Sequence, residues 1–145
     1  MDEIIQEKIS ADHLLYVSLK YTKTCDVIMN LLLRWRKMID TCIIKTLQAS
    51  NREGKLSEVS DNAMGRIAQV KDLLKKDKNA LETISFFMML RKLENLQTER
   101  IGEFRKNVTL KVVFKGETID INLEKLKEYA EMLEKFVEMT KSRIR

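Results

Sequence analysis

The sequence predicts a mainly α-helical fold, a bundle of four to five helices with one β-hairpin before the C-terminal helix. The 145 residues include no proline and only four glycines, so few positions interrupt a helix. Apolar residues recur at spacings of three and four along most of the chain, and at a spacing of two only over about 108–121. The length fits a single domain over residues 1–145.

The first predicted helix spans residues 2–24. Its stripe, with a spacing of three and four, is made of Ile5, Ile9, His13 or Leu14, Val17, Tyr21 and Thr24. Ser10 is an alternative start for a second helix, which would leave 2–9 as a short leader. A turn near 22–25 separates this helix from the next. One long bent helix is the other interpretation, because neither glycine nor proline lies between them.

Residues 26–50 form the most apolar segment of the chain. Its polar residues step by three and four along a single narrow stripe, which consists of Asp26, Asn30, Arg34, Lys37, Thr41 and Lys45. The remaining apolar arc is wider than one neighbouring helix covers. Such a helix is central in a bundle or also faces a second subunit. Since a monomer of this size would struggle to cover the arc, we expect a twofold homodimer.

The remaining elements follow from their breakers, caps and periodicity. Gly54 ends the second helix, and Ser57 or Ser60 caps a third helix near 60–76. A long fourth helix is predicted over 79–106. Two alternating runs around Gly116 predict the hairpin at 108–121. Asn122 then caps a final helix over 123–144.

Composition excludes some classes of function. The net charge of +5, with both signs interspersed, permits nucleic-acid binding without demanding it. No apolar run is long enough to span a membrane, and the first residues lack the pattern of a signal peptide, so a cytoplasmic location is expected. Cys25 and Cys42 are interpreted as buried thiols. With a single histidine they cannot complete a zinc site, so we expect no metal and no cofactor.

The candidate site residues are weak signals, and no glycine-rich phosphate loop accompanies them. His13 is the only imidazole, the commonest general base, and the alternative is a partly buried histidine on a helix flank. The run Arg34-Trp35-Arg36-Lys37 mixes cations with an aromatic ring and is a candidate nucleic-acid contact through Arg34 and Lys37.

A second group of candidates lies toward the end of the predicted fourth helix. On a helix Arg91 and Glu94 share one face, and Arg105 continues their line. Arg100 belongs to a charged cluster with Glu99, Glu103 and Arg105, which is either an anion site or a salt-bridged helix face. A pocket lined by Arg91, Glu94 and Arg105 would indicate a ligand site.

The run from Phe86 to Leu93, followed by Glu103-Phe104-Arg105-Lys106-Asn107, resembles the HEPN-like helical bundles. That resemblance implies a partner of minimal nucleotidyltransferases or a toxin ribonuclease. Catalytic members carry an arginine, usually followed by a polar residue, with a histidine four to six residues later. Arg105 and Asn107 match the arginine end, but Thr109, Leu110 and Lys111 stand where the histidine belongs, so the resemblance implies a non-catalytic copy. The chain equally fits an archaeal-type family of unknown role.

These observations predict a non-enzymatic interaction protein, a helical bundle that self-associates and docks a protein or nucleic-acid partner. The alternative is a HEPN-like RNA-binding module or ribonuclease that uses Arg100, Arg105 and His13. The expected partners are a second copy of the chain, a protein such as a nucleotidyltransferase, or RNA.

Overall fold

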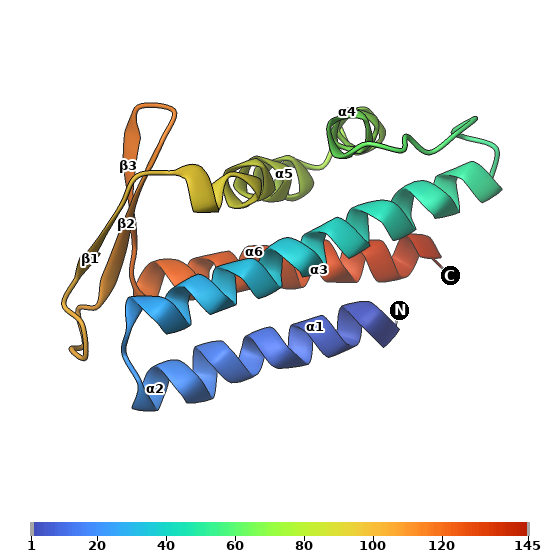
Figure 1. Ribbon diagram of the computed structural model, residues 1–145. Helices are drawn as coiled ribbons and strands as arrows, with labels where there is room; N and C mark the ends of the chain where they lie inside the picture. Colours follow the sequence, from blue (N-terminus) through green and yellow to red (C-terminus); the bar gives the residue numbers. More distant parts are fainter. Residues whose placement is uncertain (1, 145) are drawn as a thin grey trace.

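The computed structural model describes residues 2–144 and confirms a mainly α-helical fold with a small antiparallel sheet before the last helix (Figure 1). The first helix, α1, is followed by a π-helical segment and a short α2, and a 3₁₀ turn links α5 to the sheet. The elements are α1 Asp2–His13, π-helix Leu14–Ser18, α2 Leu19–Tyr21, α3 Cys25–Arg52, α4 Ala63–Leu73, α5 Lys78–Arg91, 3₁₀ turn Leu93–Asn95, β1 Thr98–Ile101, β2 Thr109–Phe114, β3 Glu117–Ile121 and α6 Leu123–Ile144.

Helix α3 is the centre of the structure. It contacts α1, α4, α5 and α6, and its N-terminal end also meets β2. In Figure 1, α1 lies on one side of α3, and the sheet stands at the end where α3 and α6 begin. One continuous hydrophobic core includes residues from all of these elements. The prediction that this segment is central in a bundle is therefore confirmed.

The expectation that one chain cannot cover the apolar arc of this helix is wrong. Leu31, Leu32 and Ile39 are completely buried within a single chain, and Trp35 is only 3% exposed. The Trp35 ring packs edge-on against Phe86, with the ring centroids 6.1 Å apart. Helices α1, α4, α5 and α6 of the same chain contact α3 and cover this apolar arc. The width of the arc therefore does not support a homodimer.

The predicted stripe of the first helix faces the opposite way from our expectation. The apolar residues that α1, the π-helical segment and α2 bury on the side of α3 are Ile4, Ala11, Leu15 and Leu19. The predicted stripe of Ile5, Ile9, His13, Val17 and Tyr21 is exposed. Both sets recur mainly every fourth residue, so periodicity alone does not distinguish the inner face from the outer one.

The predicted helix over 79–106 is wrong beyond residue 91. Helix α5 ends at Arg91, and Thr98–Ile101 forms β1, which pairs antiparallel with β2. The predicted cluster of Glu99, Arg100, Glu103 and Arg105 therefore does not lie on a helix face, and Arg105 does not continue a helical line from Arg91 and Glu94. The predicted hairpin at 108–121 is confirmed as β2 and β3, and β1 extends it to three strands.

Local signals place most of the other boundaries. Gly54, with φ +77°, follows the end of α3, and Lys115 and Gly116 both have the positive φ that tight hairpin turns need. The Asn122 side chain accepts a hydrogen bond from the Lys125 amide (2.8 Å), as an N-cap does. The N-cap of α4 is Asn62 rather than Ser57 or Ser60.

The sheet is fastened to the start of α3 by Glu103. The Cys25 amide, one of the unpaired donors at the helix N-terminus, donates to Glu103 Oε1 (3.1 Å). The Arg100 side chain on β1 forms an ion pair with Asp26 Oδ1 (2.6 Å). The Cys25 thiol donates to the Thr109 carbonyl oxygen (3.3 Å). Two members of the charged cluster that we predicted on a helix, Arg100 and Glu103, therefore join the sheet to α3.

We predict that Glu103→Ala lowers the free energy of unfolding by about 1 kcal/mol, because it removes a charged acceptor from a helix N-terminus. Glu103→Gln, which keeps an acceptor without the charge, should cost less. Urea denaturation measures both effects, and Glu131→Ala on the exposed face of α6 is the control. Equal losses for Glu103→Ala and Glu131→Ala would contradict this role.

Both cysteines are free and buried, as expected. Burial raises the pKa of the Cys42 thiol from 9.0 to about 12, because the thiolate would be desolvated in the core. The unfolded chain therefore releases this proton at a lower pH than the folded chain does. The resulting stabilisation is complete below pH 9 and declines as the pH rises toward 12.

We predict that Cys42→Ala makes the alkaline loss of stability shallower, by up to about 1.4 kcal/mol per pH unit. The measurement is urea denaturation at several pH values from neutral to alkaline, on the variant and the unaltered chain. The variant starts from lower stability because it leaves a small cavity, so the slope with pH is the readout. Parallel pH profiles would refute the prediction.

Candidate functional site: a basic pocket beside helix α3

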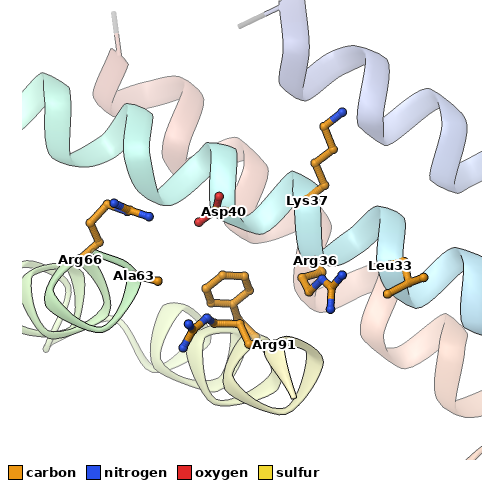
Figure 2. A pocket seen from close by; sticks show the side chains of 8 residues that line it. Leu33, Arg36, Lys37, Asp40, Ala63, Arg66 and Arg91 are labelled. Carbon is orange, nitrogen blue, oxygen red and sulfur yellow. The ribbon is translucent and has the colours of Figure 1, made fainter. Parts of the chain in front are cut away.

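A pocket of about 520 Å³ lies between α3, α4 and α5 (Figure 2). Apolar side chains from each of the three helices, Leu33, Ala63 and Phe87, contribute to its lining. Its charged residues are four cations and one carboxylate: Arg36, Lys37, Arg66, Arg91 and Asp40. The pocket is thus strongly basic in a chain whose charges are otherwise mixed.

The local sequence explains how these side chains come together. Arg36, Lys37 and Asp40 lie within about one turn of α3. Arg66 lies in the first turn of α4, which the Asn62 side chain caps by accepting from the Gly65 amide (2.7 Å). Arg91 is the last residue of α5, where a cation also favours the helix dipole.

Arg36 is held firmly by partners outside the pocket. Its Nη1 atom donates to the Leu90 carbonyl oxygen (3.2 Å) and to the Glu94 carboxylate in the 3₁₀ turn. The hydrogen bond from Arg36 lowers the pKa of Glu94 below its ordinary value. This pair joins α3 to the end of α5, and it leaves little of the Arg36 charge uncompensated.

Arg66 and Arg91 carry the uncompensated charge of the pocket. Arg66 Nη1 donates only to the Ser60 carbonyl oxygen (3.3 Å), and its buried Nε has no hydrogen-bond partner. Arg91 Nη1 contacts the Met64 sulfur (3.1 Å), which is a weak acceptor. Within residues 2–144 neither guanidinium forms a salt bridge.

Lys37 links the pocket to a second hollow of about 480 Å³ along α3, which also contains Leu14, Asn30, Leu33 and Arg34. Its Nζ atom lies 3.1 Å from Glu7 Oε1, and Arg34 Nη1 lies 3.6 Å from Glu7 Oε2. Figure 2 shows the Lys37 amino group directed toward α1, away from Arg66 and Arg91. The nearly buried Glu7 therefore neutralises part of the charge of the second hollow.

The chemistry that this arrangement supports is anion binding. Two unpaired guanidinium groups over an apolar floor present planar pairs of donors, which match the oxygens of a phosphate or carboxylate. Asp40 is the one carboxylate in the lining, and its charge repels an anionic ligand on its side of the pocket.

The structure brings together only some of the predicted site residues. Arg34, Lys37 and Arg91 line the two hollows, and Glu94 lies beside them as the partner of Arg36. Arg100 is on β1, and Arg105 is in the exposed turn between β1 and β2. A pocket lined by Arg91, Glu94 and Arg105 does not form, because the helix ends at Arg91.

His13 lies apart from the pocket, on the exposed side of α1. The residues that sequence reasoning missed are Arg36 and Arg66. Arg36 belongs to the basic run 34–37, which was a usable signal. It was not predicted as a contact because it lies outside the narrow polar stripe that contains Arg34 and Lys37. Nothing in the sequence around Arg66 indicates that α4 folds back to place it opposite Arg91.

In the stretch from residue 2 to residue 144, no three histidine, cysteine, aspartate or glutamate side chains gather as metal ligands. No helix in that stretch has the length and apolarity that crossing a membrane demands. Comparison with protein-family models, with curated proteins and with solved structures found no match to this chain.

Proposed function

We propose that this chain is a non-enzymatic interaction protein that binds single-stranded RNA in the basic pocket and acts as a homodimer. The observation that supports RNA binding is the pair Arg66 and Arg91, two guanidinium groups without carboxylate partners in a pocket with an apolar floor. Phosphate oxygens are natural acceptors for such a pair.

The second hollow supports a chain of phosphates rather than a single anion. It shares Leu33 and Lys37 with the pocket, and the two hollows follow one another along α3. A nucleic-acid strand that binds Arg66 and Arg91 would continue along α3 past Lys37 and Arg34, whose charges Glu7 neutralises only in part. Trp35 takes no part in base stacking, because its ring is buried against Phe86 and Tyr129.

The ribonuclease alternative has less support than simple binding. A HEPN-like reaction would need Arg105 and His13 at one substrate, but these residues lie on different elements and neither lines the basic pocket. A protein partner of the nucleotidyltransferase kind is a further hypothesis, and no feature of the basic pocket favours it over RNA.

We predict that Arg66→Ala/Arg91→Ala weakens binding to a labelled single-stranded RNA by at least about a hundredfold, because two charged hydrogen bonds are removed and each costs roughly 1.5–3 kcal/mol. Fluorescence anisotropy at several salt concentrations is the measurement. The slope of log affinity against log salt should fall by about 0.7 for each phosphate that the variant no longer neutralises.

The matched control is Lys127→Ala/Lys135→Ala, which removes the same charge from exposed positions of α6. Thermal unfolding followed by circular dichroism confirms that both double variants remain folded. Equal weakening by the two double variants would mean that binding depends on net charge alone. If the unaltered chain fails to bind RNA at low salt, the proposal is wrong.

A further inference from the structure

The outer face of the N-terminal helical segment is apolar, and no part of the chain between residues 2 and 144 covers it. Ile9 is 57% exposed, Tyr21 is 78% exposed, and Ile5 and Val17 are also exposed. Along the chain, Ile5, Ile9, Val17 and Tyr21 lie four, eight and four positions apart, with His13 midway between Ile9 and Val17. They are called here the outer stripe of α1.

The π-helical segment helps to keep the outer stripe straight. Residues eight apart on a regular α-helix are rotated by about 80° relative to one another. The wider turns at Leu14–Ser18 reduce this rotation between Ile9 and Val17. The same turns keep Ala11, Leu15 and Leu19, spaced by four, on the buried side. The segment is therefore apolar on two opposite faces.

An apolar stripe of this length is unusual on a surface that only water contacts. The segment from Asp2 to Tyr21 is about 30 Å long. Long contiguous apolar surfaces on proteins mark sites of association. The inner face of this segment is satisfied by α3, so the outer stripe requires another explanation.

The charges at the two ends of the stripe indicate its occupant. Asp2 and Glu3 lie in the first turn, and Lys20 and Lys23 lie at the other end. Two parallel copies would bring like charges together at both ends, whereas two antiparallel copies bring carboxylates against ammonium groups. Antiparallel packing also aligns the helix dipoles favourably. The charges at the two ends of the stripe therefore favour antiparallel pairing of two copies over parallel pairing.

We propose that two copies of the chain pair antiparallel through the outer stripe of α1, with the twofold axis at His13. In this register Ile9 of one copy faces Val17 of the other, and Ile5 faces Tyr21. The acidic first turn of one copy then lies beside the end of the other that carries Lys20 and Lys23, and the two His13 residues meet at the axis. The proposal rests on the self-association part of the proposed function and replaces the apolar arc of α3 as its surface.

The interface is small, because one helix pair buries less than the 1,200–2,000 Å² of a typical stable complex. A dissociation constant of about 1–100 μM is therefore expected. Sedimentation equilibrium should show a single-chain mass of 17.0 kDa at low concentration and an average mass that rises toward twice that value as the concentration increases through this range.

The first test is Ile9→Glu/Val17→Glu, which places four carboxylates in the paired stripe of the dimer. The dissociation constant should rise by at least about a hundredfold, because these charges lose their water without gaining partners. Ala68→Glu on the exposed side of α4 is the control and should leave self-association unchanged. A dimer that persists in the double variant would place the interface elsewhere and overturn this surface.

The second test fixes the direction and register by disulfide cross-linking. His13→Cys puts two thiols at the twofold axis, so mild oxidation should give a covalent dimer. Ile9→Cys should not cross-link, because the two residues would lie about 12 Å apart along the axis, beyond the reach of a disulfide. A mixture of Ile9→Cys and Val17→Cys chains should cross-link to each other. The unaltered chain, whose cysteines are buried, is the background control.

The outcomes test the antiparallel pairing and the proposed RNA binding separately. Cross-linking by Ile9→Cys alone would mean parallel pairing and would overturn the antiparallel register. A chain that stays monomeric at about 200 μM, twice the upper end of the expected range, and gives no cross-link would overturn self-association altogether, and with it that part of the proposed function. RNA binding is measured on Arg66 and Arg91, which lie outside the stripe, so it stands or fails separately.

Discussion

The fold depends on the burial of α3 by its neighbours. Its inward residues contact α1, α4, α5 and α6, and the core that they form is continuous. The N-terminal end is fixed by the Thr24 cap and by the carboxylate of Glu103, which ties the sheet to the helix. Because α1, α4, α5, α6 and β2 all contact this helix, their positions depend on it. The positions of the sheet and of the basic pocket therefore depend on α3.

The site follows from what the packing of α3 leaves uncovered. Helices that bury an apolar arc expose the remaining side, and on α3 that side carries Arg34, Arg36 and Lys37. These cations have acidic partners, Glu94 for Arg36 and Glu7 for the other two. The two arginines that α4 and α5 contribute arrive without such partners. The uncompensated charge thus comes from the elements that fold against α3 and not from α3 itself.

The sequence predicted the parts of the fold that rest on local chemistry. Gly54, Gly116 and Asn122 act as expected because a positive φ or a capping side chain is needed at one residue. Prediction from the sequence failed where contacts between distant segments determine the secondary structure or the position of a side chain. Thr98-Glu99-Arg100-Ile101 is polar and carries no strand pattern, and only its pairing with β2 makes it a strand. Its charges suit an exposed sheet edge, since they oppose pairing with another chain. Arg66 could not be assigned to a site because no local signal fixes the path of α4.

The apolar stripe of α1 that we expected to be buried is exposed, and it is the surface through which we propose that two copies pair. Sequence periodicity correctly found an apolar face at Ile5, Ile9, Val17 and Tyr21, but a second, opposite face, made of Ile4, Ala11, Leu15 and Leu19, meets α3. A helix that is apolar on two sides lies between two packing partners, and the chain supplies one of them. If the second partner is another copy, both basic pockets remain open, because their linings share no residue with the outer stripe. A dimer would then present two anion sites to one RNA strand, and the second contact would form at a high effective concentration. Pairing through α1 would in this way raise the apparent affinity of the pockets for one strand, which gives one physical reason for the two surfaces to occur in the same chain.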